Sequence, residues 1–541
     1  MCSFIYIPRS ISILYSMATP LANTSMQHTA PPQSPPAAPH PFNSRILIGV
    51  FGVFAAAMMS GLNSRIGGLS LIDIKTAFGV GADEGSWIGS LYSAFELAAM
   101  PFAAWFAVTF SFRRFHVGVV IIFTVLGLLT PFAPGFGVLL ALRCLQGFFG
   151  GLLIPVLMAA ALRFFPLPLR LYGLALYAMT ATFSPNIATW LSATYTDTLS
   201  NWHLVFWQIV PLAIFSIWAV AWGIPQDPVR LERLKNLDWL GLVSGVCGLV
   251  CIGVGLAQGE RYDWFNDALI TWLFCLGAIL LFVFLLAEWF HPLPFIKLQL
   301  LHRRNLGLGF TIFIALVVVL LSGSLLPAQY LIEVRGFRTP YIAGIGLLIG
   351  VPQILCGPAV SFLLYKQWID ARHVFATGLA CLAASCLVNA HVTSDWIAHE
   401  FLIGQVLQAL GQPMAVISLL FLATSVVQPM EGPVVSGIIN MFRAFGTLLG
   451  DAMLERVFSL REKMHANVIL DSAAAAGMIT PPQHTGALEA LGVLAERISR
   501  QAFVLAIADS YLILGTLAVL LIPLVLNLNY IRPPILNSTS R

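Results

Sequence analysis

Charged residues are scarce in this chain of 541 residues, since only 10% are Asp, Glu, Lys or Arg while 58% are hydrophobic. An ordinary soluble domain carries roughly 25% charged residues, so a soluble core cannot bury this much apolar surface. A lipid bilayer can, because about 20 consecutive apolar residues cross the roughly 30 Å of hydrocarbon. The composition therefore predicts an all-α polytopic membrane protein.

The chain also lacks a basic stripe and any pattern of metal ligands. Its formal net charge is +4, and the basic residues are scattered between apolar runs. Such a distribution cannot follow a phosphate backbone, so we expect no nucleic-acid partner. Seven of the eight cysteines lie in or beside apolar runs without metal-type spacing to histidine, so we interpret them as small hydrophobic residues and expect no metal or cofactor: Cys144, Cys247, Cys251, Cys275, Cys356, Cys381 and Cys386.

Apolar runs of membrane-spanning length recur fourteen times along the chain. An even number of spans places both termini on the same side of the membrane. The predicted spans are 46–72, 86–108, 116–134, 136–162, 171–194, 203–223, 239–258, 268–290, 308–331, 340–365, 373–391, 398–424, 433–457 and 503–527.

The basic residues of the short loops give the orientation. Twelve lie on the side of the termini and four on the opposite side, so the positive-inside rule places both termini on the cytoplasmic side of the membrane. We expect that membrane to be a bacterial inner membrane. The twelve are Arg113, Arg114, Arg163, Arg170, Arg230, Arg233, Lys235, Lys297, Arg303, Arg304, Lys366 and Arg372, and the four are Lys75, Arg261, Arg335 and Arg338.

Three segments fall outside the spans. Residues 1–45 are rich in proline and predict a disordered cytoplasmic tail, with Met1, Met17 or Met26 as the start of translation, and residues 528–541 predict a second tail. Residues 458–502 predict a periplasmic loop, in which LEALGVLAERISRQAF has the pattern of an amphipathic helix.

Two motifs carry a resemblance to a known family. The predicted fourth span contains LRCLQGFFGG, where Arg143, Gln146, Gly147 and Gly151 resemble an R-x-x-Q-G-x-x-x-G signature. The segment LDWLGLVSGVCGLVCIGVGLAQGERYDWFND resembles the first of two extra central spans, with the loop after it, in the same family. The chain thereby resembles the EmrB/QacA-type drug:proton antiporters, the fourteen-span branch of the major facilitator superfamily. The resemblance implies a 6 + 2 + 6 fold, with bundles at 46–223 and 308–527 and two extra helices at 239–290.

Several positions depart from the family pattern. The loop after the second span has Ala104, Val108 and Ser111 where the family has glycine, an acid and glycine. The fifth span reads SPNIATW and keeps Pro185 but not the paired glycines. In the first span Asn63 stands where the family has an acid, with Arg65 two residues later, and the second span supplies Glu96 in place of an amide.

Glu96 is the leading candidate for the proton carrier. Counted from the outer ends of their helices, Arg65 lies roughly 10 Å deep and Glu96 roughly 15 Å deep, so we expect an ion pair in one layer of the membrane. Glu96 then exchanges protons while Arg65 tunes it, or the pair is permanently ionised and only orients the helices. Asp451 is a second candidate acid, although the glycines around it also suit close helix packing.

The family resemblance implies that Arg143 takes part in proton coupling and that Gln146, Gly147 and Pro185 belong to gating motifs. The alternative for Arg143 is a hydrogen-bonding support within its own helix. We expect substrate contacts from polar and aromatic groups of the spans, each of which could instead join two helices: Asn63, Tyr92, Gln329, Tyr330, Gln412, Asn440 and Arg443.

The sequence thus predicts proton-coupled efflux of a small amphipathic compound, either a drug or an aromatic or anionic metabolite. Arg65 and Arg443 favour an anion if they share a cavity. The alternatives are a membrane-embedded enzyme acting on a lipid-linked substrate, for which no spacing of catalytic residues is recognisable, and a receptor that transports nothing. The resemblance also implies a periplasmic membrane-fusion adaptor and an outer-membrane channel as partners. Residues 458–502 are then the expected docking segment, and the alternative is a lid over the outer mouth.

Overall fold

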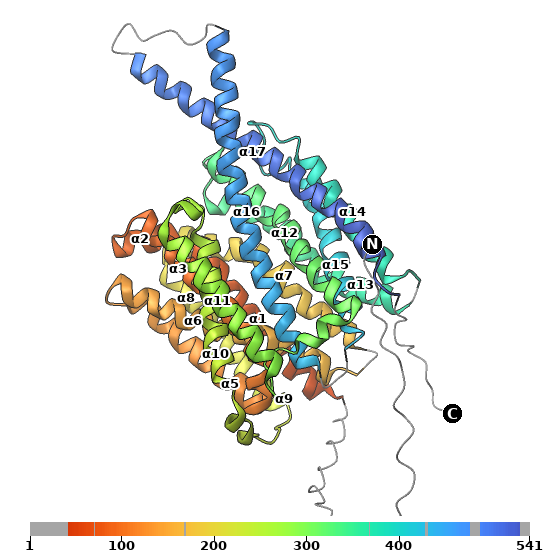
Figure 1. Ribbon diagram of the computed structural model, residues 1–541. Helices are drawn as coiled ribbons and strands as arrows, with labels where there is room; N and C mark the ends of the chain where they lie inside the picture. The colour runs from red at the N-terminus through yellow and green to blue at the C-terminus, as the bar shows by residue number, and fades with distance from the viewer. Residues whose placement is uncertain are drawn as a thin grey trace, which may run out of the picture. The chain divides into compact units, whose positions relative to one another are not determined.

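A computed structural model describes residues 42–69, 71–166, 169–366, 368–427, 431–476 and 487–530. Within these residues the regular structure is helical (Figure 1). The first helix begins at Ser44, close to the predicted end of the N-terminal tail. Residues 1–41 and 531–541 lie outside the described part, so the two predicted tails are not tested.

The helices follow the predicted apolar runs. For description we group the helices, in chain order, into a first bundle, a central pair and a second bundle. The first bundle comprises α1 Ser44–Leu69, α2 Leu71–Phe78, α3 Ala82–Ala99, α4 Ala103–Thr109, α5 Phe112–Leu129, α6 Phe136–Phe164, α7 Arg170–Ala193, α8 His203–Trp207 and α9 Ile209–Gly223. The central pair is α10 Trp239–Gln258 and α11 Ala268–Phe290. The second bundle comprises α12 Arg304–Glu333, α13 Thr339–Tyr365, α14 Ala371–Asn389, α15 Leu402–Thr424, α16 Gly432–Ala475 and α17 Ala487–Leu526.

Thirteen stretches of the described chain are long and apolar enough to cross a membrane. The predicted span 171–194 forms α7, which is not among them, because polar residues interrupt its apolar sequence. Thr180, Ser184 and Asn186 of this helix are each at most 3% exposed, since α7 packs against α1, α13 and α15. Protein contacts take the place of lipid around this helix, and its polar groups are tolerated there.

The predicted loop 458–502 is largely helical. The helix of the thirteenth predicted span, α16, continues to Ala475, and α17 begins at Ala487. Figure 1 shows these two helices leaving the bundle together, and His465 and Asp509 join them with a contact of 2.8 Å between Nε2 and Oδ2. The amphipathic helix expected in this segment is therefore the first part of α17.

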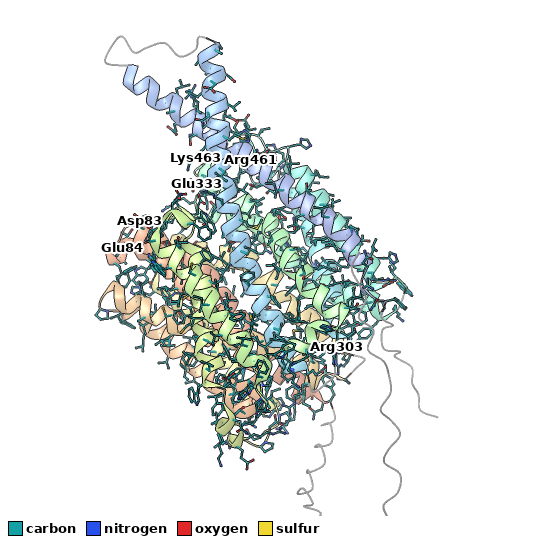
Figure 2. The ribbon with its side chains drawn as sticks, in the orientation of Figure 1. Asp83, Glu84, Arg303, Glu333, Arg461 and Lys463 are labelled. Atoms are coloured by element: carbon teal, nitrogen blue, oxygen red, sulfur yellow. The ribbon has the colours of Figure 1, made fainter. Side chains whose placement is uncertain are left out.

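The two ends of the whole helical assembly can be identified by charged residues that lie there. Figure 2 shows Asp83 and Glu84, at the start of α3, on the same side as Arg461 and Lys463 of the extended α16, and Arg303 near the other end. Arg303 donates two hydrogen bonds to Glu431, at 2.7 and 2.8 Å. We call the end with Arg303 the inner end and the end with Asp83 the outer end.

The two bundles are closely packed toward the inner end. Ser436 of α16 donates to the carbonyl of Pro155 in α6, and the Tyr177 hydroxyl of α7 donates to Asn440 Oδ1 at 2.9 Å. The backbone N–H of Leu171 donates to the Tyr365 hydroxyl of α13 at 3.1 Å. These contacts form a closed layer across the two bundles.

The turn between α4 and α5 contains a residue with unusual backbone geometry. Ser111 has φ 73° and ψ 131°, in the region that favours glycine. This is the position where the family pattern has glycine. Ser111 is buried, and its Oγ accepts a hydrogen bond from Gln226 Nε2 at 3.1 Å. A serine therefore adopts here a backbone conformation that favours glycine.

Candidate functional site

A cavity of about 430 Å³ lies among helices of both bundles. It is lined by α1, α3, α6 and α7 of the first bundle, by α12, α15 and α16 of the second, and by α10 of the central pair. Small-molecule sites occupy roughly 300–1,000 Å³, so the size suits a compact organic ligand. Among the predicted site residues, those that line it are Arg65, Glu96, Pro185, Gln412, Arg443 and Asp451.

Helix α16 presents a polar stripe to this cavity. Arg443, Thr447, Asp451 and Glu455 all line it and follow one another at intervals of four residues, which places them on one face of an α-helix. The stripe extends over about 18 Å, and it continues away from the closed inner layer that Ser436 and Asn440 help to form. Its basic residue lies nearest that layer and its two acids lie toward the outer end.

Glu96 accepts a hydrogen bond from Ser64, the residue next to its expected partner Arg65. Ser64 of α1 donates a hydrogen bond from Oγ to Glu96 Oε2 at 3.0 Å. Both Glu96 and Arg65 are described, and no ion pair joins them, so the expected salt bridge is absent. The guanidinium groups of Arg443, Arg65 and Arg143 nevertheless act on the Glu96 carboxylate electrostatically.

Arg443 connects the two bundles across the cavity wall. Its Nη1 donates to Thr180 Oγ1 of α7 at 2.8 Å, and its guanidinium lies 5.8 Å from the centre of the Tyr177 ring. No salt bridge to Arg443 is found among the described residues, so its positive charge is available to a ligand. Hydrogen bonding to Thr180 holds the side chain at the wall.

Gln412 belongs to a polar row on α15. Its Nε2 donates to Gln408 Oε1 at 3.2 Å, and Gln408 Nε2 donates to Ser322 Oγ of α12 at 2.8 Å. This row joins α15 to α12 where Gly323 leaves room for the amides. Gln412, at the cavity end of the row, presents a side chain whose orientation its neighbour fixes.

Arg143 lies behind the cavity wall and is completely buried. Its Nη1 donates to Gln146 Oε1 at 2.8 Å, and its guanidinium centre lies 4.1 Å from the centre of the Tyr92 ring. Within the described part of the chain, Nε and Nη2 of this residue have no hydrogen-bond partner. A buried cation with two unpaired donors is sensitive to any change in nearby negative charge.

The glycines that follow Arg143 bring two helices together. A Cβ at Gly147 would collide with the carbonyl oxygen of Tyr92, and one at Gly151 with the carbonyl oxygen of Glu96. The G-x-x-x-G spacing thus lets α6 contact the backbone of α3 at the level of the acid. The glycine motif of α6 therefore packs directly against the backbone of Glu96.

Other predicted contact residues lie outside the cavity lining. Asn63 and Tyr92 are buried behind the wall. Tyr330 donates from its hydroxyl to the carbonyls of Thr393 and Trp396, and Asn440 bonds Tyr177 and Ser436. Gln329 is partly buried and does not line the cavity either.

The sequence analysis missed Ser64, Thr447 and Glu455. The four-residue spacing of Arg443, Thr447, Asp451 and Glu455 is visible in the sequence and could have revealed Thr447 and Glu455, whereas no sequence signal singles out Ser64. With Glu455 included, the charged residues lining the cavity are two arginines and three acids, a net charge of −1 when all are ionised. Among the described residues, no group of three or more His, Cys, Asp or Glu side chains could hold a metal ion.

Residues 51–451 match the family described as Major Facilitator Superfamily. The chain is similar to the colistin resistance protein EmrB of Acinetobacter baumannii, with 26% identity over 429 residues, 78% of this chain and 81% of that protein. It is similar to the multidrug export protein EmrB of Escherichia coli, with 22% identity over 508 residues, 91% and 96% of the two chains. The structure of the peptide transporter POT in complex with sulfate has the same fold, with a TM-score of 0.55 at 16% identity over 88% and 94% of the chains. The predicted fold class and the resemblance to EmrB-type proteins are confirmed.

Proposed function

The chain belongs to the Major Facilitator Superfamily, and we propose that it is a proton-coupled exporter of small amphipathic compounds. Membership in this superfamily argues against the alternative of a membrane-embedded enzyme. The observation that carries the proposal is Glu96, a buried carboxylate that lines a cavity among helices of both bundles. An ionisable residue at membrane depth that faces a cavity is suited to bind and release protons.

Glu96 couples the proton to the substrate by competition. A proton that reaches Glu96 from the outer end removes one negative charge from the cavity and weakens the attraction for a bound cationic compound. After the compound leaves outward, the bundles rearrange, the closed layer at Ser436 and Asn440 opens, and Glu96 releases its proton inward. Arg143, with unpaired donors behind the wall, responds to the change of charge and supports the rearrangement.

The charges of the cavity do not favour an anionic substrate. The preference for an anion rested on Arg65 and Arg443, but Glu96, Asp451 and Glu455 line the same cavity. With Glu96 protonated, two positive and two negative charges remain. Such a lining accepts neutral, zwitterionic or cationic amphipaths at least as well as anions.

We place the protein in a bacterial inner membrane with both termini in the cytoplasm, on the basis of the twelve basic residues of the inner loops. The cavity then faces the periplasm. The extended parts of α16 and α17 lie on that side and are the proposed docking element for a membrane-fusion adaptor with its outer-membrane channel.

Proteoliposomes test this function. Purified protein is reconstituted, an inward or outward proton gradient is imposed, and movement of cationic, neutral and anionic amphipaths is recorded. Gradient-driven movement of at least one compound supports the proposal. A complete lack of movement in either gradient, with intact protein in the membrane, contradicts it.

A further inference from the structure

The central helix α10 supplies part of the cavity lining. Leu256 and Ala257, near its outer end, line the cavity together with residues of α3 and α16. The two extra helices therefore do more than lengthen the chain between the bundles. Their first member lies where it can contact a compound held by the cavity.

Hydrogen bonds fasten the outer end of α10 to α3. Gln258 is buried, and its Nε2 donates to Ser86 Oγ at 3.1 Å and to Ser90 Oγ at 2.8 Å. One helical turn earlier, a Cβ at Gly253 would lie 3.0 Å from the Cα of Ala94, so the two backbones are close. Because Ser86 and Ser90 also line the cavity, α10 and α3 form one continuous wall.

Helix α10 also approaches α16 of the second bundle. Leu448 Cδ1 would lie 3.7 Å from a Cβ at Gly253. In the connection to α11, Glu260 and Asp263 each lie 3.5 Å from Arg456 Nη1. Helix α10 thus occupies the space between α3 and α16 at the outer half of the cavity.

We propose that α10 is a specificity-determining wall of the substrate site and that the small side chain of Ala257 sets the size of compound that fits. This inference rests on the proposed transport function and deepens it. Ala257 presents a single methyl group, partly exposed, to the cavity. A bulkier side chain there takes space from a volume of about 430 Å³ while leaving the charged residues of α16, and Glu96, in place.

Ala257→Phe is the first test, with Ala278→Phe as the matched control. Ala278 is an exposed alanine of the neighbouring α11 that does not line the cavity. Initial rates in proteoliposomes are compared for small and large amphipaths of the same charge. We expect Ala257→Phe to lower transport of the large compounds by about tenfold or more relative to the small ones, and the control to lower neither. A ratio of large-compound to small-compound rates in Ala257→Phe that equals the ratio in the native protein contradicts the inference.

Cysteine labelling tests the same point in a protein whose shape is barely altered. In a variant with the eight native cysteines replaced by serine, Ala257→Cys is treated with a membrane-impermeant maleimide, with and without a panel compound. The inference predicts that the compound slows labelling at 257 and has no effect at Ala268→Cys, an exposed position at the outer start of α11 that does not line the cavity. If a compound is transported but does not slow maleimide labelling at 257, the inference is overturned and the transport function is not. A panel in which nothing is transported and nothing protects overturns both.

Discussion

The hydroxyl of Ser64 in α1 donates a hydrogen bond to Oε2 of Glu96 in α3 at 3.0 Å. A hydroxyl can donate to a carboxylate and can also accept a hydrogen bond from a carboxylic acid. Ser64 can therefore remain bonded to Glu96 in both protonation states. This hydrogen bond joins α1 to α3 at the residue proposed as the proton carrier.

Ser64→Ala removes this link. A hydrogen bond to a charged group contributes about 1.5–3 kcal/mol, so we expect proton-coupled exchange to fall by about tenfold or more. Ser64→Thr retains the hydroxyl and is expected to retain most of the exchange. Equal exchange by the alanine variant and the native protein contradicts a role for Ser64.

Asp451 and Glu455 line the outer part of the cavity, and Asp451→Asn and Glu455→Gln change the charge there. Each removes one negative charge, so the double variant changes the net charge of the ionised lining from −1 to +1. We expect the KM for a cationic amphipath to rise and that for an anionic analogue to fall. Uptake by vesicles measures both constants, and constants that do not depend on the charge of the compound contradict this assignment of the stripe on α16.

Gly151→Val places a side chain against the carbonyl of Glu96. Overpacking of this kind costs about 1–3 kcal/mol, so the thermal unfolding midpoint in detergent is expected to drop. Gly118→Val in α5 is the control, because nothing lies within 4 Å of a Cβ at that position. A midpoint lowered equally by both substitutions shows that the close approach of α6 to α3 does not determine the effect.

Ser111→Gly relieves the backbone strain at φ 73°. Ser111→Ala is the matched comparison, because both variants lose the hydrogen bond from Gln226 and only alanine keeps the Cβ. Strained conformations of this kind cost of order 1–3 kcal/mol, and we expect the glycine variant to be more stable than the alanine variant by about that amount. The midpoint of thermal unfolding measures the difference, and the reverse order contradicts strain at this turn.

The helices could be predicted from the sequence because membrane depth requires long apolar runs. Two helical segments are more polar than this rule requires, although 171–194, which forms α7, is among the predicted spans. Helix α7 is polar yet internal, since neighbouring helices cover Thr180 and Asn186. The segment after residue 457 is polar and continues as helix, because α16 and α17 contact each other there through His465 and Asp509.

The site could be predicted only in part, for a geometric reason. Counting residues along a span gives depth, and depth placed Arg65 near the level of Glu96. It does not give direction around the helix axis, and adjacent residues point about 100° apart, so Ser64 reaches the carboxylate while Arg65 forms no salt bridge with it. Tyr330 shows the same limit, since its hydroxyl bonds the carbonyls of Thr393 and Trp396.

The assignment of Glu96 as the proton carrier is tested most directly by substrate-induced proton movement in proteoliposomes that contain the native protein or Glu96→Gln. Glutamine keeps the size of the side chain and cannot ionise, so the account predicts that a transported compound moves protons in the native protein and none in the variant, with the compound still bound. Proton movement by Glu96→Gln at the native rate contradicts the account and transfers the role of carrier to Asp451 or Glu455.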